Sequence, residues 1–264
     1  MYIRSWYSAL TLTRVDGRPA GQRPYESRIR SIAAPPELKE LIRDVPGWLT
    51  DEEAEALYEA ARSCGGRGAI VEIGSWKGKS TICLALGSRA GAGARVYAVD
   101  PHADYRFGDF KDNIERAGVE DLVTPVSSLS QPYADEFHEP VELLWIDGAH
   151  EYRLVLEDFE KWTPKVLEGG IVALHDTSWA EGPRRVANER ILRSRHFKDA
   201  RFVVGSTTMA RKVAENSGTD RVKNLYVLAL KETFASGSAL LKERRGLLPA
   251  PVERLGRRLV GWLQ

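Results

Sequence analysis

Short apolar runs alternate with amphipathic stretches through most of the chain. The runs at 69–73, 95–99, 122–126, 141–146 and 171–174 are rich in Val, Ile, Leu and Ala, as expected of strands that are buried on both faces. The stretches at 80–88, 107–117, 152–162 and 183–193 between them have the composition of helices. Strands that alternate with helices of about 10 residues predict βαβ units and a parallel sheet.

The last part of this region lacks a convincing helix between its apolar segments. We predict one strand within 202–213 and another at 224–230, joined by 214–221, and we expect the two to form an antiparallel hairpin at the sheet edge. The predicted fold class is therefore α/β. It is a doubly wound, Rossmann-like sheet of seven strands that is mostly parallel and carries an antiparallel edge hairpin.

The two ends of the chain have a different character from this central region. Residues 1–48 carry many arginines and five prolines, and we interpret them as an N-terminal arm with at most one short helix around 37–43. A capping-box pattern at Thr50 opens a helix to residue 62, and the predicted central domain covers 49–235. Residues 236–264 are predicted to be a C-terminal amphipathic helical extension that packs on its own domain or on a twin subunit. Docking on a membrane surface is the alternative.

The composition of the chain restricts which binding partners and which cellular compartment we expect for the protein. The 264 residues carry a net charge of +1, which gives no general attraction for nucleic acid or an anionic membrane. No run approaches the roughly 18 apolar residues that span a bilayer, the first residues do not resemble a signal peptide, and the two cysteines lack a metal-type spacing. We therefore expect a cytoplasmic protein that binds a small molecule and no nucleic acid. A homo-oligomeric state is left open.

A glycine-containing turn at 72–80 follows the first predicted strand and opens a helix. Gly74 and Gly78 let the backbone turn tightly and approach a ligand closely, and the first amides of the helix can hold a carboxylate. Three residues separate the two glycines, which excludes a P-loop, and the dinucleotide pattern G-x-G-x-x-G is absent. Glu72 would suit a ligand ammonium, and Asp100, at the end of the second strand, would suit two ribose hydroxyls.

This pattern resembles the first two motifs of class I S-adenosylmethionine-dependent methyltransferases. The resemblance implies S-adenosyl-L-methionine as the cofactor, with Ser127 and Ser128 after the third strand in the region that reaches the adenine. The predicted cofactor-binding residues are Glu72, Gly74, Ser75, Lys77, Gly78, Ser80, Asp100, Ser128 and Asp147.

Two acids and two histidines follow the fourth and fifth predicted strands. Asp147 ends the strand at 141–146, with His150 three residues later, and the pair His175 and Asp176 ends the strand at 171–174. Because parallel strands end at the same edge of a sheet, we expect these four side chains to converge where ligands bind. They can bind a divalent cation, place a base, or do both.

The segment from Asp147 to Asp176 resembles a bacterial family of methyltransferases. That family includes sugar and macrolide O-methyltransferases and cephalosporin-hydroxylase-like proteins. Its pattern of Asp-Gly-x-His-x-Tyr, then Gly-Gly and His-Asp, is present here, and the resemblance covers about residues 68–190. It implies that Asp147 and Asp176 are metal ligands and that His150 is the general base, with Asp147 also part of the catalytic site. His175 stands where relatives often have an acid, so it either completes the metal site or points away.

The function expected from these resemblances is O-methylation of a small-molecule hydroxyl of a sugar, glycoside or polyketide-type acceptor. Mg²⁺ or Mn²⁺ would assist, since acids at these positions hold magnesium in the more distantly similar catechol O-methyltransferases. Three alternatives stay open: a metal-free methyltransferase that uses His150 alone, a cofactor-binding accessory protein without turnover, and an NAD-dependent oxidoreductase.

Overall fold

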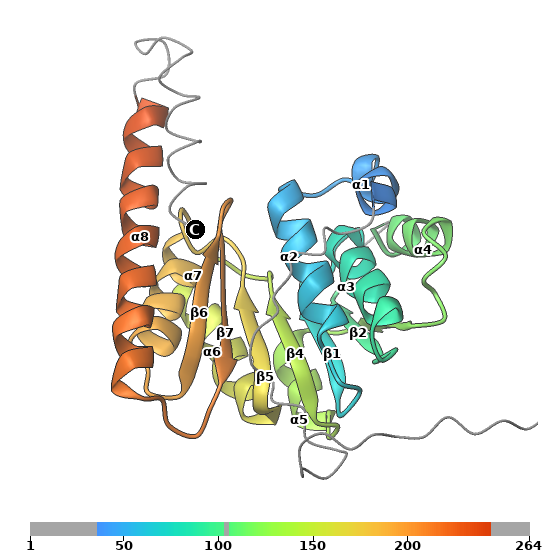
Figure 1. Ribbon diagram of the computed structural model, residues 1–264. Helices are drawn as coiled ribbons and strands as arrows, with labels where there is room; N and C mark the ends of the chain where they lie inside the picture. Colours follow the sequence, from blue (N-terminus) through green and yellow to red (C-terminus); the bar gives the residue numbers. More distant parts are fainter. Residues whose placement is uncertain (1–35, 103–105, 244–264) are drawn as a thin grey trace, which may run out of the picture. The chain divides into compact units, whose positions relative to one another are not determined.

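Seven strands form one mixed sheet in the part of the chain that this computed structural model describes, residues 36–102 and 106–243 (Figure 1). The strands are β1 (Ala69–Ile73), β2 (Val96–Asp100), β3 (Val123–Ser127), β4 (Val141–Ile146), β5 (Val166–Leu174), β6 (Phe197–Val203) and β7 (Thr207–Lys212). Their order is β3-β2-β1-β4-β5-β7-β6. Strands β1 to β5 are parallel, and β7 is antiparallel to both β5 and β6.

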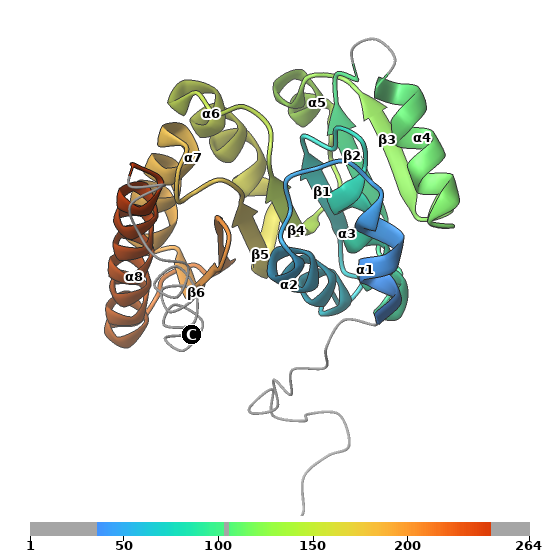
Figure 2. The same cartoon turned by 90° about the horizontal axis from the view of Figure 1, so that it is seen from above.

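Helices cover both faces of this sheet (Figure 2). They are α1 (Pro36–Arg43), α2 (Asp51–Arg62), α3 (Lys79–Ala90), α4 (Arg106–Arg116), α5 (Ser130–Glu136), α6 (Tyr152–Trp162), α7 (Glu181–Val186) and α8 (Gly218–Glu243), with a 3₁₀ turn at Thr163–Lys165 and a π-helical turn at Ala187–Leu192. Helices α1 to α4 share one hydrophobic core with the sheet, and α5 to α8 share the other.

The apolar runs of β1 and β4 form central strands because a hydrophobic core covers each face of the sheet there. All residues of β1 and β4 are buried, and their side chains alternate between the two cores. Leu143 and Trp145 belong to the core under α2 and α3, whereas Leu144 and Ile146 belong to the core under α6. The prediction of a doubly wound, mostly parallel sheet with an antiparallel edge is confirmed.

The predicted position of the edge hairpin was wrong by one element. Residues 224–230 are not a strand but part of α8, and the hairpin is formed instead by β6 and β7 across the turn at 204–206. The burial pattern of α8 explains the difference: Asn224, Leu228, Lys231 and Ala235 are buried, at the spacing of a helix face. A short apolar run fits a strand and a buried helix equally well, so periodicity alone could not decide here.

Three helices, α1, α5 and α8, test further predictions from the sequence. Helix α5 was not predicted, and the short helix expected around 37–43 is present as α1. Helix α8 runs past the predicted boundary at 235 without a break, and the division into three segments stays a prediction. The amphipathic pattern beyond Pro251 lies outside the described residues.

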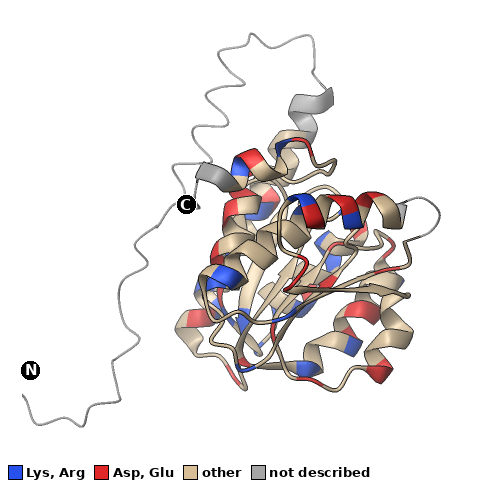
Figure 3. Ribbon diagram, turned by 90° about the vertical axis from the view of Figure 1, so that its right-hand side faces the viewer, with Lys and Arg blue, Asp and Glu red and all other residues tan. Residues whose placement is uncertain are grey.

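Within residues 36–102 and 106–243, no helix combines the length and the apolar character needed to cross a bilayer. Basic and acidic side chains are interspersed on the helices visible in Figure 3, which agrees with the net charge of +1.

Candidate active site

The glycine-containing turn of residues 74–78 connects β1 to α3 and lies against the end of β4. Gly74 and Gly78 both have left-handed backbones, with φ of +87° and +88°. A Cβ atom on Gly74 would lie 2.1 Å from the carbonyl oxygen of Asp147, a separation that no side chain can tolerate. The glycine is therefore required both for the backbone conformation and for contact with β4.

Asp100 lies beside this turn at the carboxyl end of β2. One carboxylate oxygen accepts a hydrogen bond from the backbone N–H of Trp76 at 3.0 Å, and the other accepts from the backbone N–H of His102 at 2.8 Å. The carboxylate therefore joins the end of β2 to the glycine-containing turn, at the position where the sequence predicts contact with a ribose.

Glu72 lies beneath the glycine-containing turn, in the interior of the domain. Its side chain is fully buried, and its carboxyl oxygens accept hydrogen bonds from the hydroxyls of Ser80 and Thr81 in the first turn of α3. Burial raises the pKa of Glu72 to about 8, although these two hydrogen bonds oppose the shift. Glu72, together with Ser80, therefore attaches α3 to β1 beneath the turn, and its contact with a ligand ammonium stays a prediction.

The remaining predicted cofactor residues lie along the same edge of the sheet. The Ser75 hydroxyl is 3.4 Å from Nε2 of His102, and Lys77 forms an ion pair of 2.6 Å with Asp109. Ser128 follows β3 and donates its hydroxyl to a neighbouring carbonyl. They frame the ends of β1 to β3.

The structure brings together all four side chains that were predicted at the ends of β4 and β5. Nδ1 of His175 lies 2.9 Å from a carboxylate oxygen of Asp147 and 3.3 Å from one of Asp176. Nε2 of His150 lies 2.9 Å from the other carboxylate oxygen of Asp176. We refer to Asp147, His150, His175 and Asp176 as the rim cluster. One ligand atom from each of Asp147, His175 and Asp176 lies within 4.8 Å of the others, so these three could hold a metal ion.

Burial and neighbouring charges shift the pKa values of the rim cluster in opposite directions. Burial alone would lower the pKa of His175, but the neighbouring carboxylates of Asp147 and Glu53 outweigh it and raise this pKa to about 10. Burial raises the pKa of Asp147, and the contact with His175 opposes that shift. A protonated His175 in this position balances the charge of two carboxylates. His150 differs from His175 because about half of its side chain is exposed.

Asp176 is held in an unusual backbone conformation. Its φ is +58°, in the left-handed region, which side chains other than glycine, asparagine and aspartate seldom adopt. One carboxylate oxygen accepts hydrogen bonds from the Trp179 indole at 2.8 Å and from the Ser206 hydroxyl at 3.2 Å. The Trp179 ring also packs edge-on against His150, with 5.1 Å between ring centroids. Such a conformation, supported by surrounding bonds, is typical of functional sites.

Glu53 is a neighbour of the rim cluster that sequence reasoning missed. It lies in the first turn of α2, is almost completely buried, and approaches Nε2 of His175 to 3.4 Å. Burial acts to raise the pKa of Glu53, but its contacts with His175 and with Thr50 and Thr207 lower it overall. The sequence signal at this position, the pattern Thr50-x-x-Glu53, indicated a capping box. That box is present, but the pattern carries no information about which distant residue the glutamate meets.

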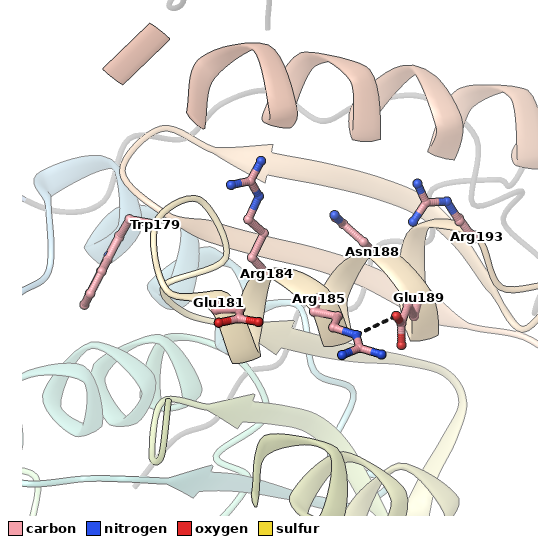
Figure 4. A pocket seen from close by; sticks show the side chains of 7 residues that line it. All are labelled: Trp179, Glu181, Arg184, Arg185, Asn188, Glu189 and Arg193. Carbon is pink, nitrogen blue, oxygen red and sulfur yellow. Dashed lines mark hydrogen bonds and ion pairs between the residues drawn. The ribbon is translucent and has the colours of Figure 1, made fainter. Parts of the chain in front are cut away.

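Two hollows are present in this part of the chain, one at the rim cluster and one along α7. The smaller one is lined by cluster residues together with Ile146, Val155 and Pro183. The larger, of about 340 Å³, runs along α7 (Figure 4). Its lining residues are Trp179, Glu181, Arg184, Arg185, Asn188, Glu189 and Arg193. Most of this charge is paired locally, since Arg185 bonds to Glu189 and Arg184 bonds to Glu232 of α8.

Comparison with known proteins agrees with this geometry. Residues 71–177 match a family model described as a methyltransferase domain. The matched segment, and not the whole chain, is thereby similar to a methyltransferase domain. The match begins in β1 and ends just after Asp176, so it spans both the glycine-containing turn and the rim cluster. The recognition made from the sequence is confirmed.

The chain is similar to a curated protein and to several solved structures. It is 31% identical over 121 residues to the uncharacterized protein y4gI of Sinorhizobium fredii; the match covers 42% of this chain and 13% of that protein. An O-methyltransferase from Bacillus cereus in complex with SAH superposes with a TM-score of 0.55 and 22% identity, over 69% of this chain and 93% of that one. The O-methyltransferase TomG from Streptomyces achromogenes gives 0.52 and 17%, over 67% and 88%. These similarities show a shared fold.

Proposed function

We propose that this methyltransferase transfers the methyl group of S-adenosyl-L-methionine to a hydroxyl of a small-molecule acceptor at the carboxyl ends of β1, β4 and β5. The observation that carries the proposal is the backbone contact between Gly74 and Asp147, which puts the cofactor turn directly beside the rim cluster. Similar structures that are described as O-methyltransferases support the reaction class. A sugar, glycoside or polyketide-type acceptor stays a prediction.

The cofactor would be held by the turn and by the end of β2. Backbone amides at the start of α3 would bind its carboxylate, because the first amides of a helix have no partner within the helix. The carboxylate of Asp100 would accept hydrogen bonds from the ribose hydroxyls, and Ser128 lies at the same edge for the adenine. Methyl transfer itself needs mainly alignment of the acceptor oxygen with the sulfonium methyl group.

His150 would remove the proton from the acceptor hydroxyl. Its imidazole is the accessible one of the rim cluster, whereas that of His175 is buried among carboxylates. The carboxylate of Asp176, 2.9 Å from Nε2, would orient the His150 ring and stabilise the proton after transfer. An aliphatic hydroxyl is a poor nucleophile at neutral pH, so a base at this point is the chemistry that the reaction requires.

The donor set of Asp147, His175 and Asp176 fits a divalent cation. Three donor atoms converge, and the two carboxylates would repel each other without positive charge between them. An imidazole among the donors suits Mn²⁺ better than Mg²⁺, which prefers oxygen ligands. When bound, a cation of this kind would orient the acceptor oxygen and stabilise its developing negative charge.

A metal-free reaction is the second candidate, and one observation favours it. Nδ1 of His175 already lies within 3.3 Å of both carboxylates, so its positive charge can replace that of a cation. In that case His150 would be the sole catalyst.

The test is methyl transfer from isotopically labelled S-adenosyl-L-methionine to a panel of sugar, glycoside and phenolic acceptors, analysed by mass spectrometry. We expect transfer by the wild-type chain and a loss of about 10²–10⁴-fold in His150→Ala, the usual contribution of a general base. Binding of a nicotinamide dinucleotide in place of S-adenosyl-L-methionine would contradict the proposal. Cofactor binding without transfer to any acceptor would support the accessory-protein alternative instead.

A further inference from the structure

Trp179 belongs both to the surroundings of the rim cluster and to the hollow along α7. Its indole N–H donates to Asp176 at 2.8 Å, and its ring lies edge-on against His150, with 5.1 Å between ring centroids. The same residue lines one end of the hollow of about 340 Å³ along α7 (Figure 4). Although its orientation is fixed in this way, 57% of Trp179 is exposed. Part of the indole is therefore free to contact a ligand beside the proposed base.

Helix α7 is packed directly against the segment that carries His150. A Cβ atom on Gly182 would lie 2.2 Å from the carbonyl oxygen of His150, so only glycine allows this approach. Pro183, the next residue, lines the smaller hollow together with His150. Glu181, at the start of the same turn, lines the larger one. The first turn of α7 therefore contributes residues to both hollows.

Polar side chains that line the hollow along α7 are held in place by partners of opposite charge. Nε of Arg185 donates to Glu189 at 2.8 Å, and the guanidinium lies 4.0 Å from the centroid of the Tyr152 ring. The Tyr152 hydroxyl donates to the other carboxylate oxygen of Glu189 at 2.8 Å. Toward α8, Nε of Arg184 donates to Glu232 at 3.0 Å. A ligand would meet donors and acceptors whose positions are already fixed, which lowers the entropic cost of binding.

The charges around this hollow cancel. Three arginines and two glutamates line it, and Glu232 of α8 pairs with one of the arginines. A phosphate or carboxylate would call for an excess of positive charge, and an apolar acceptor would call for an apolar wall. Of the seven described residues that line the hollow, only Trp179 has an apolar side chain. Balanced charges suit a neutral ligand with several hydroxyls, because each hydroxyl can both donate and accept hydrogen bonds.

We infer that the hollow along α7 binds the sugar ring of a neutral glycoside acceptor, which stacks on Trp179. The inference rests on the proposed function, because the hydroxyl to be methylated would lie at His150. The C–H groups of a sugar ring pack on an aromatic face, whose π electrons carry partial negative charge. Hydroxyls of the ring would then bond to the pair of Arg185 and Glu189. The π-helical turn at Ala187–Leu192 forms part of this wall, and such turns are frequent at functional sites.

The experiment compares Trp179→Phe with Trp179→Ala in the full-length chain. Both substitutions remove the hydrogen bond to Asp176, but only Trp179→Phe keeps an aromatic ring beside His150. A difference between the two variants therefore measures stacking of the ligand, separately from the support that Trp179 gives to Asp176.

Arg185→Ala tests the polar wall, and Arg195→Ala is its matched control. Both arginines are exposed and each pairs with a glutamate, but only Arg185 lines the hollow. The ligands are neutral methyl pyranosides, the corresponding sugar 6-phosphates and catechol, each with and without S-adenosylhomocysteine. Binding is measured by saturation-transfer difference NMR, which detects contact between the protein and the C–H groups of a ligand without turnover.

We expect the wild type and Arg195→Ala to bind at least one methyl pyranoside through its ring C–H groups, and to bind the 6-phosphate no more tightly. Trp179→Ala should weaken this binding about 10-fold, whereas Trp179→Phe should stay within about 3-fold of the wild type. Arg185→Ala should also weaken it about 10-fold, because it removes hydrogen bonds from a charged group.

Three results would overturn the inference. The wild type might bind no pyranoside with or without S-adenosylhomocysteine, it might prefer a sugar phosphate or catechol, or the two Trp179 variants might lose binding equally. Methyl transfer to a phenolic acceptor that Trp179→Ala leaves unchanged would also refute the inference, while the proposed function would stand. Pyranoside binding that depends on Trp179, without transfer to any acceptor, would refute the proposed function and leave the sugar site in place.

Discussion

Gly74 and Asp147 are in such close contact that a Cβ atom on the glycine would lie 2.1 Å from the aspartate's carbonyl oxygen. The first residue belongs to the glycine-containing turn after β1, and the second directly follows β4 and belongs to the rim cluster. The backbones of the two sites are therefore packed directly against each other at the point where the strand order reverses, which is where ligands bind in sheets of this type.

This contact changes what a substitution at Gly74 should do. A side chain at this position would strike the backbone at the end of β4. Gly74→Ala should therefore weaken the fold as well as cofactor binding. Overpacking should cost about 1–3 kcal/mol beyond the strain of the left-handed backbone.

Gly93→Ala is the matched control for this prediction. Gly93 also has a left-handed backbone, with a φ of +71°, but a Cβ there meets nothing within 4 Å. Gly93→Ala therefore introduces backbone strain without a steric clash. Denaturant unfolding of both variants and calorimetry with S-adenosylhomocysteine would test the difference. Equal stability and equal affinity in the two variants would refute the importance of the contact between Gly74 and Asp147.

Asp100→Ala should weaken binding of S-adenosylhomocysteine about 10–100-fold. Hydrogen bonds to a charged group contribute about 1.5–3 kcal/mol, and each 1.4 kcal/mol is tenfold in affinity. Part of the loss would come from the turn itself, because Asp100 also accepts from the backbone of Trp76. Asp121→Ala, which removes an exposed acid paired with Arg89, is the control and should bind normally. Unchanged affinity in Asp100→Ala would place the cofactor elsewhere.

Glu72 should make stability fall as the pH rises. Its pKa is about 8 in the folded chain, against an ordinary value of 4.5, so between these pH values the folded state holds a proton that the unfolded state has released. The free energy of unfolding then decreases with pH, by at most about 1.4 kcal/mol per pH unit from this one group. Glu72→Gln should remove this component. The check is denaturant unfolding from pH 5 to 8; parallel curves for the two proteins would show that Glu72 is ionised when folded.

The fold could be predicted from the sequence wherever burial imposes a clear pattern. Strands β1 and β4 are short apolar runs because both of their faces are buried, whereas the edge strand β3 is only partly buried. The pattern failed at 224–230, where an apolar segment on α8 looked like a strand. The start of α8 lies upstream of this segment. Ser217 and Asp220 bond to each other's backbone N–H groups there and cap the helix.

The candidate site could be predicted only in part, because sequence position at a strand end does not fix where a side chain points. The rim cluster follows from topology, since β4 and β5 are parallel neighbours that end at one edge. The contacts of Glu72 could not be predicted, because they are made with hydroxyls of α3. Glu53 was missed because its partner, His175, is more than 100 residues away and the loop at 205–207 that joins them has no distinctive pattern.

Removing divalent cations should lower methyl transfer by at least about 10-fold, with recovery on adding Mn²⁺ or Mg²⁺. The reason is the pair of carboxylates at Asp147 and Asp176, which gain a bridging positive charge when a cation binds. The measurement is transfer after exhaustive chelation, and the control is cofactor binding, which should survive chelation. Full activity in chelator would mean that His175, and not a cation, balances the carboxylates of Asp147 and Asp176. His150 would then be the sole catalyst.

The central claim is that the rim cluster performs chemistry on a cofactor held next to it by the turn after β1. The most direct measurement compares the wild type with Asp176→Asn, using calorimetry with S-adenosylhomocysteine and transfer of a labelled methyl group to an acceptor that the wild type accepts. We predict that Asp176→Asn binds the cofactor as the wild type does and transfers methyl groups at least about 100-fold more slowly, because it loses both a cation ligand and the partner of His150. Transfer at the wild-type rate by Asp176→Asn would contradict the account.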